Sequence, residues 1–345
     1  MGRINVGFWK GIITGSKVDV VPNPGTADYI LIRFKLSVAR PDRDAGDGEL
    51  TKERLTGILR QETLLVMVHR NDNPSLFDRI VDENWRPGDG IFIKGKLTAK
   101  TFTKKNTGCP RGHVNRERSP ITYVTPVFAE RVASFGNDAD SETHSRKLRF
   151  LSENREVSNN IISSGFLASD PRKIKTKDGL VGISFPYALD RKYFQASDPE
   201  TRSDVLFVKV YGEQALEDRK RLKHRSEIGI EGFVQMRPVR RKAVCRERLL
   251  DENGDYILDE LGQPVICGEH YTWEDRIWEI VPYVSGIDYH RDCRTDEEIA
   301  MLEAQEAEKR PTVLLTGTGV NPDEMSPQEF DAHLDEFYKG TVSEF

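Results

Sequence analysis

Residues 30–38 read ILIRFKLSV, so every second side chain is apolar, while Arg33 and Lys35 fall between them. Successive side chains of a β-strand point to opposite faces, and this alternation is therefore typical of a strand that buries one face. Residues 181–189, VGISFPYAL, show the same alternation in the second half of the chain. The sequence thus predicts a matching strand in each half.

The correspondence continues along both halves in a constant order. In each half a first strand precedes the matching strand. After the matching strand come a strand, a short helix, a strand, a long polar loop and a closing strand. Apart from the loop, the elements that follow the matching strand are expected at residues 64–68, 74–85, 90–97 and 124–132, and at residues 206–210, 213–224, 227–234 and 278–285. Five strands with a helix between the third and fourth have the connectivity of an OB-fold barrel. The predicted fold class is therefore all-β, with two tandem five-stranded OB-fold barrels. A single large β-sandwich is the alternative, although it would not require a recurring helix.

The length and charge of the chain agree with a two-domain organisation. The predicted boundaries are residues 1–135 for the first barrel, 136–158 for a polar linker, 159–292 for the second barrel, and 293–345 for an acidic tail with short helices. Residues 295–345 hold 13 acidic and 3 basic residues, a net charge of −10, whereas the rest of the chain has a net charge of +5. A basic body with an acidic tail indicates a core that binds a polyanion.

Composition excludes several classes of protein. Hydrophobic residues make up 37% of the chain and charged residues 31%, which is typical of a soluble globular protein. The sequence has no apolar run near the ~18 residues that a membrane-spanning helix needs, and its first residues do not resemble a signal peptide. Four cysteines are too few for a disulfide framework. We therefore expect an intracellular, cytoplasmic protein.

Positive charge gathers at equivalent places in the two halves. Residues 94–118 hold eight basic residues and one acidic residue, and residues 235–248 hold six basic residues and one acidic residue. Both clusters follow the predicted fourth strand, where the hairpin of an OB fold contacts oligonucleotides. A solvated loop would explain either cluster alone, but their coincidence favours a binding surface.

Single-stranded nucleic acid requires cations for its phosphates and flat rings for its unstacked bases. Alternate residues of a strand share one face. On several predicted strands this places aromatic and basic side chains together on the outer face, and further candidates lie in nearby loops. The candidate DNA-binding residues are Trp9, Arg33, Lys35, Phe92, Lys94, Lys96, Lys100, Phe102, Lys104, Lys105, Arg111, Arg116, Arg118, Arg191, Tyr193, Phe207, Lys209, Tyr211, Phe233, Arg237, Arg240, Arg241, Lys242 and Trp273.

Three stretches of the first half carry a family resemblance: residues 4–11 (INVGFWKG), 28–40 (DYILIRFKLSVAR) and 85–97 (WRPGDGIFIKGKL). They resemble the first strand, the second strand, and the passage from helix to fourth strand in bacterial single-stranded DNA-binding proteins. The resemblance is good over residues 1–135 and weak over 157–290. It implies a non-enzymatic protein that coats and protects single-stranded DNA during replication, recombination or repair. The resemblance also implies the cytoplasm of a bacterium or of a phage-infected cell.

The resemblance also implies partners. Family members carry one OB fold per chain and assemble four, so we expect a homodimer of this two-barrel chain. Their acidic tails end in a hydrophobic residue that docks replication and repair proteins. This chain ends in Phe345 after an acidic residue, although the usual aspartate-rich run and penultimate proline are absent. An amphipathic helix is expected over residues 326–338, and the candidate partner-binding residues are Phe330, Leu334, Phe337 and Phe345.

Two Cys–His pairs suggest a zinc site, but the chain between them argues against it. Cys267 and His270 have CxxH spacing, and His290 and Cys293 have HxxC spacing. The predicted closing strand lies between them and extends about 30 Å at 3.3 Å per residue. We therefore predict no metal and no cofactor; Cys109 and His113 form an even weaker pair.

Two functions other than single-stranded DNA binding stay open. One is an OB-fold RNA-binding or translation-associated module, since OB grooves serve either nucleic acid. The other is a metal-dependent nucleic-acid enzyme, although the sequence contains no P-loop, GxSxG or HExxH motif.

Overall fold

The structure, a computed structural model, describes residues 4–25, 28–40, 59–136, 140–175, 181–191 and 195–309. It divides the chain into two units, Met1–Thr295 and Asp296–Phe345. All described strands belong to the first unit, and the described part of the second unit is the helix α5 (Asp296–Lys309).

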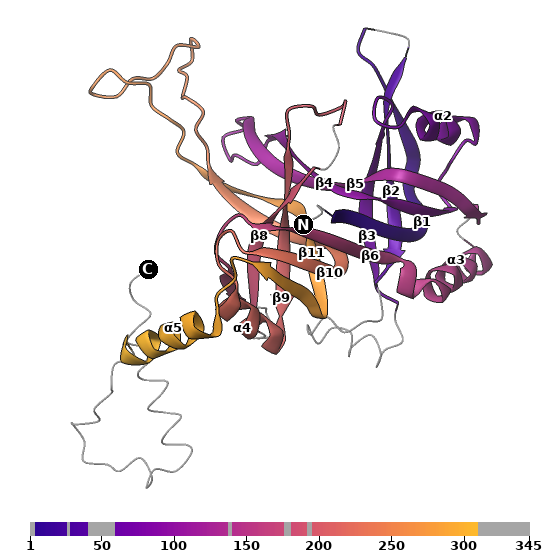
Figure 1. Cartoon of the computed structure of the whole chain (residues 1–345). Helices are drawn as coiled ribbons and strands as arrows, with labels where there is room; N and C mark the ends of the chain where they lie inside the picture. Colours follow the sequence, from indigo (N-terminus) through magenta and orange to yellow (C-terminus); the bar gives the residue numbers. More distant parts are fainter. Residues whose placement is uncertain are drawn as a thin grey trace. The chain divides into compact units, whose positions relative to one another are not determined.

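The first half forms a closed ring of five strands, and Figure 1 labels these strands. Strand β1 pairs with β2 and β4, β2 pairs with β3, and β4 pairs with β5, all antiparallel, while β3 and β5 close the ring in parallel at Val66 and Val124. The elements are β1 (Ile4–Pro22), β2 (Tyr29–Ala39), β3 (Gln61–His69), α2 (Pro74–Asp82), β4 (Asp89–Asn106) and β5 (Asn115–Ser134).

The second half has the same order of pairing. Strand β6 pairs with β8 and β10, β8 pairs with β9, β10 pairs with β11, and β11 meets β9 in parallel. The elements are β6 (Asn159–Leu167), β7 (Arg172–Lys175), β8 (Val181–Asp190), β9 (Ser203–Tyr211), α4 (Gly212–Arg221), β10 (Glu227–Val244) and β11 (His270–Arg291). The predicted all-β OB-fold class is confirmed, and a helix precedes the fourth strand of each ring.

Local sequence explains the helix α2. The side chain of Asn73 caps its first turn by accepting a hydrogen bond from the backbone N–H of Leu76, and Pro74 occupies the first turn, where no amide donor is needed. Leu76, Phe77 and Ile80 are buried and pack into the hydrophobic core of the ring. The helix therefore stabilises the ring by closing its core.

The segment that the sequence predicts as a linker is partly helical. Helix α3 (Ser141–Glu153) is capped by Asp140, whose carboxylate accepts a hydrogen bond from the N–H of Thr143, and a 3₁₀ turn follows at Arg155–Val157. Next, Ser158 is fully buried and its hydroxyl donates to the carbonyl of Lys10. The linker is thus anchored to β1.

The two rings are joined through their first strands. Strands β1 and β6 pair antiparallel from Ile4–Ser164 to Trp9–Asn159, so a single run of backbone hydrogen bonds continues from one ring into the other. Because the side chains of both rings pack beside this junction, buried residues of the two halves belong to one hydrophobic cluster.

A buried polar contact adds to this junction. The guanidinium of Arg40 donates to Gln235 at 2.7 Å and pairs with Glu62 at 3.1 Å, and Glu62 also accepts from the backbone N–H of Met236. Burial raises the pKa of the Glu62 carboxyl above its ordinary value, although Arg40 opposes this effect. The contact satisfies polar groups that would otherwise be costly to bury.

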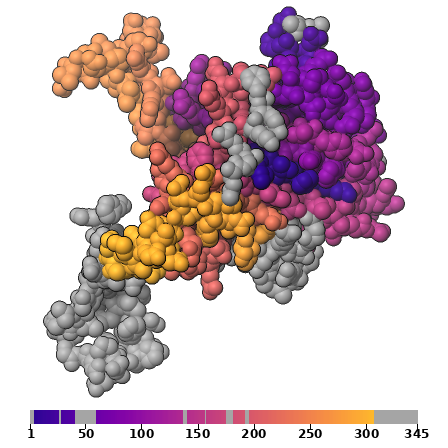
Figure 2. Space-filling view, in the orientation of Figure 1, coloured from indigo at the N-terminus to yellow at the C-terminus, as the bar shows by residue number. Residues whose placement is uncertain are grey.

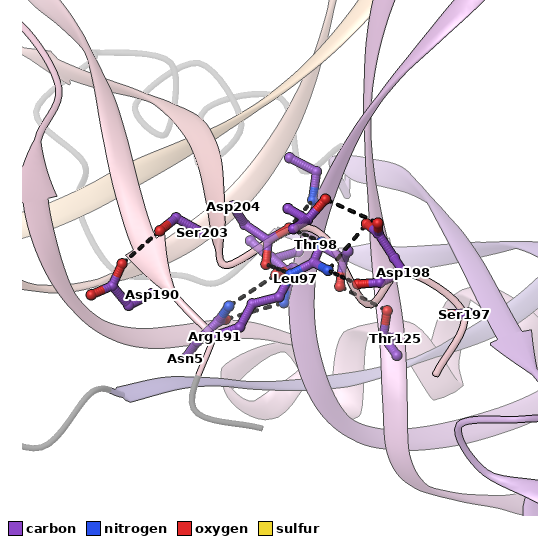
Figure 3. A network of polar contacts seen from close by, with 12 residues as sticks. Asn5, Leu97, Thr98, Thr125, Asp190, Arg191, Ser197, Asp198, Ser203 and Asp204 are labelled. Carbon is purple, nitrogen blue, oxygen red and sulfur yellow. Dashed lines mark hydrogen bonds and ion pairs between the residues drawn. The ribbon is translucent and has the colours of Figure 1, made fainter. Parts of the chain in front are cut away.

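A second polar network centres on Arg191 (Figure 3). Its guanidinium donates two hydrogen bonds of 2.8 Å to Asp204 and one of 3.1 Å to Asp198. Asp204 also accepts from the backbone N–H of Ala99 in the first ring. The side chains of Arg191 and Asp204 are only 4% and 1% exposed. The expectation that Arg191 binds DNA is therefore wrong, because these two aspartates enclose its charge.

We expect Arg191→Leu to lower the free energy of unfolding by about 3–5 kcal/mol, because it leaves the buried Asp204 carboxylate without its partner. Urea unfolding followed by circular dichroism measures this change. Arg202 lies on the same connection but is exposed, so Arg202→Leu is the matched control and should change stability by less than about 0.5 kcal/mol. Equal effects of the two substitutions on stability would contradict the role of Arg191 as the buried partner of Asp204.

Candidate nucleic-acid interface

The two basic hairpins, β4–β5 and β10–β11, lie side by side. The hydroxyl of Ser119 on β5 donates to Asp275 on β11 at 2.8 Å, and Arg111 pairs with Glu269 at 3.4 Å. Figure 2 shows the purple atoms of the first hairpin against the orange atoms of the second. The basic clusters found separately in the two halves of the sequence therefore form one surface, which we call the hairpin surface.

Several cations of the hairpin surface are exposed and form no ion pair with any other residue in the described part of the chain, among them Lys104, Lys105, Arg116, Arg118 and Lys242. Lys105 lies directly opposite Arg116 across the β4–β5 ladder. Like charges opposite one another are unfavourable for the fold. This arrangement is therefore better suited to binding an anion than to stabilising the hairpin.

An aromatic ring lies next to these cations. Trp273 on β11 is half-buried and stacks on Tyr271, with the ring centroids 5.7 Å apart. It lines a cavity of about 160 Å³ together with Lys104 and Lys105 from the first hairpin. The remaining lining residues are Asn106, Thr107, Glu117, Ser119 and Glu274. The cavity thus combines a flat ring and two ammonium groups with polar groups that include the carboxylates of Glu117 and Glu274.

Several other basic residues are already paired with acids. Arg237 lies 3.4 Å from Glu279, Arg241 lies 3.0 Å from Asp275, and Arg33 lies 2.6 Å from Asp19. These cations neutralise charge within the protein. The positive charge available to a ligand is consequently smaller than the sequence count indicates.

Four further candidates are buried, which corrects the prediction. Trp9 and Phe233 are fully buried, Tyr211 is 7% exposed, and Lys209 is 8% exposed with its ammonium 3.3 Å from Glu279. Burial lowers the pKa of Lys209, although Glu279 opposes this shift. None of the four presents a free ring or cation to a ligand.

The reasons for these errors differ. Strand β1 carries adjacent aromatic residues, and the ring of Trp9 folds over Gly7, where a Cβ atom would lie 2.2 Å from it. Phe233 does point away from the main core, as its place in the alternation of the strand predicts. However, Tyr283 and the guanidinium of Arg40, 5.1 Å from the ring centroid, cover it. Alternation assigns a side chain to a face, but it does not say what covers that face.

The other candidates are at least partly exposed, except for Tyr193, which lies outside the described residues. Phe102 and Phe207 are each 38% exposed. Phe92 is half-buried against Phe128, with the ring centroids 6.4 Å apart. The remaining described candidates are the exposed Lys35, Lys94 and Arg240, and the half-buried Lys96 and Lys100. The partner-binding candidates Phe330, Leu334, Phe337 and Phe345 also lie outside the described residues.

Sequence reasoning missed some exposed rings. Phe128 is 42% exposed and lies opposite Lys94 in the β4–β5 register. Tyr256 is 53% exposed, with the guanidinium of Arg248 5.3 Å from its ring centroid. The alternation of β5 could have identified Phe128, whereas Tyr256 lies in the β10–β11 loop, where no periodic signal exists.

One group in the described part of the chain has the composition of a metal site: Cys109, His113, Cys245 and Cys267, whose ligand atoms lie within 4.8 Å of one another. On its spacing alone, Cys267 is instead considered together with His270, His290 and Cys293. Cys293 is not in this group, and its thiol instead contacts the backbone carbonyl of Arg291.

No protein-family model and no curated protein matches the chain. It is similar to the solved structure of the wild-type single-stranded DNA binding protein from Thermus aquaticus, with 15% identity and a TM-score of 0.43, over 68% of this chain and 86% of that one. A deletion mutant of the same protein gives 17% identity and a TM-score of 0.42, over 68% and 88%. None of the described helices is both long and apolar enough to cross a membrane.

Proposed function

We propose that this protein binds single-stranded DNA on the hairpin surface, without catalysis, and coats it during replication, recombination or repair. The observation that carries the proposal is the cavity in which Trp273 of one hairpin lies with Lys104 and Lys105 of the other. A base stacked on an aromatic ring, with cations for its phosphates, is the general mode of single-strand recognition.

The position of Trp273 favours a single strand over a duplex. Its ring is half-buried and stacked on Tyr271 on one side, so only a base that has left its own stack can lie against it. The exposed cations on both hairpins extend the positive surface beyond this ring. Their phosphate contacts would add affinity without adding sequence preference.

We expect the full chain to bind a labelled oligothymidine more tightly than a duplex of equal length or an RNA of equal sequence. Trp273→Ala should weaken binding of the oligothymidine by about 1–3 kcal/mol, the usual contribution of one stacked base. Fluorescence anisotropy measures both results. Tyr29→Ala removes a 48% exposed ring from β2 and should leave affinity unchanged. A preference for duplex, or no effect at Trp273, would contradict the proposal.

The contribution of charge to DNA affinity can be measured from the dependence of binding on salt. Each phosphate contact on a single strand contributes about −0.7 to the slope of log K against log salt. Lys104→Ala with Lys105→Ala should therefore reduce the magnitude of the slope by about 1.4. Arg146→Ala with Arg149→Ala removes the same charge from α3 and is the control. If both pairs change the slope equally, net charge rather than the hairpin surface determines binding.

We also propose that the chain forms a homodimer through the face of the sheet shared by β5, β4, β1 and β6. Ile162 on β6 lies opposite Val6 on β1. Phe8 on β1 lies opposite Lys94 on β4, and Lys94 in turn lies opposite Phe128 on β5. Directly paired residues share a face, and Ile162 and Phe128 are 45% and 42% exposed. Exposed apolar side chains gathered on one face, here around the cation Lys94, are typical of a subunit interface.

Light scattering should give twice the monomer mass of 39.3 kDa. Ile162→Glu should reduce the mass to that of the monomer, because the dimer would bury an unpaired charge. Leu261→Glu, at an 85% exposed position in the β10–β11 loop, should leave the dimer intact. A monomeric wild-type chain at micromolar concentration would refute the assembly.

A further inference from the structure

Four potential metal ligands from both halves of the chain meet beside the hairpin surface. Cys109 and His113 lie in the loop between β4 and β5, Cys245 follows the end of β10, and Cys267 precedes β11. Cys109 and Cys267 are separated by 158 positions in sequence, yet their sulfur atoms are 3.8 Å apart. Only the folded arrangement of the hairpins brings them together.

The distances fit a tetrahedron around one zinc ion. Zinc lies about 2.3 Å from a thiolate and about 2.0–2.1 Å from an imidazole nitrogen, which requires sulfur–sulfur edges of about 3.8 Å and sulfur–nitrogen edges of about 3.6 Å. The Nδ1 atom of His113 lies 3.8 Å from the sulfur of Cys109 and 3.5 Å from that of Cys245. Together with the 3.8 Å between Cys109 and Cys267, all three edges agree with this geometry.

The backbone around the cysteines is shaped to support such a site. The N–H of Cys245 donates to the carbonyl of Glu269, and the N–H of Cys267 donates to the carbonyl of Glu247, both at 2.8 Å. These reciprocal backbone hydrogen bonds hold the segments that carry Cys245 and Cys267 beside each other. Fixed backbone contacts of this kind hold the two thiols in place for a metal ion.

A turn brings the fourth ligand into place. The N–H of Gly112 donates to the carbonyl of Cys109 at 2.9 Å, and Gly112 has a φ of 77°. A residue with a Cβ atom rarely adopts this conformation. The tight turn reverses the chain, so that His113 faces the same point as Cys109.

The surroundings indicate a structural site. Cys109 and Cys245 are 3% and 0% exposed and pack with Tyr271, while Cys267 and His113 are half-buried. Four protein ligands leave no open position for water, as in structural rather than catalytic zinc sites. Three thiolates exclude magnesium and calcium, which take oxygen ligands.

We propose that Cys109, His113, Cys245 and Cys267 bind one zinc ion, which ties the β4–β5 loop to the base of the β10–β11 loop. Zinc binding at this site requires no DNA and is independent of the proposed function. The ion would link the two hairpins that line the cavity at Trp273, because Trp273 stacks on Tyr271 and Tyr271 packs against two of the ligands.

The test uses the full chain, purified under reducing conditions. Elemental analysis should find one zinc per chain, and replacement by cobalt(II) should give the intense visible absorption of tetrahedral thiolate coordination. Cys109→Ser and Cys245→Ser should each lose the zinc and the cobalt spectrum. Cys293→Ser and His270→Ala are the matched controls and should keep both, because neither residue belongs to the group.

A measurement on the wild-type chain covers the case in which a cysteine variant does not fold. With zinc bound, a thiol reagent should react rapidly only with Cys293, and a strong chelator should expose the other three of the four cysteines. The proposal fails if the folded, reduced chain takes up neither zinc nor cobalt, or if Cys109→Ser and Cys245→Ser retain the metal. A Cys109–Cys267 disulfide in the mass spectrum of the freshly purified chain would also overturn it.

Discussion

The antiparallel pairing of β1 with β6 is the constraint on which the rest of the molecule depends. Backbone hydrogen bonds are directional, and the register from Ile4–Ser164 to Trp9–Asn159 aligns the first strand of one ring with that of the other. Strands β4 and β10 pair with the outer edges of β1 and β6. The positions of both long hairpins are therefore set by this one junction.

The junction also explains why charge is distributed unevenly over the surface. Where the halves meet, cations such as Arg40 and Lys209 are buried, and each lies against a glutamate, Glu62 or Glu279. Removing a charge from water is costly unless a partner compensates it. Toward the ends of the hairpins the strands are solvated, and cations such as Lys105 need no partner there. Buried cations thus stabilise the protein, whereas exposed ones can bind a ligand.

The cavity at Trp273 requires both hairpins. Lys104 and Lys105 belong to the first half and Trp273 belongs to the second, so neither half contains the cavity by itself. The hydrogen bond from Ser119 to Asp275 joins one hairpin to the other, and the Cys–His group brings their loops together. A repeat in sequence has therefore produced one composite surface instead of two copies of the same surface.

Much of the fold could be predicted from local patterns, because these depend on neighbours in sequence. The alternation over residues 30–38 and 181–189 predicts strands β2 and β8, and Asn73 with Pro74 predicts the start of α2. Both basic clusters could likewise be found by counting charged residues along the sequence. A strand has a period of two residues and a helix has characteristic caps, whatever surrounds them.

Only the tertiary structure decided which outward faces stay exposed and which distant residues meet. Phe233 lies on an outer face that the protein itself covers, whereas Phe102 lies on an outer face that stays exposed, and the alternation around them does not distinguish the two. Cys109 and Cys267 likewise belong to different halves, and no spacing rule connects them. Periodicity reports how a side chain is oriented on its own strand, but burial and ligand geometry depend on contacts between strands that are far apart in the chain.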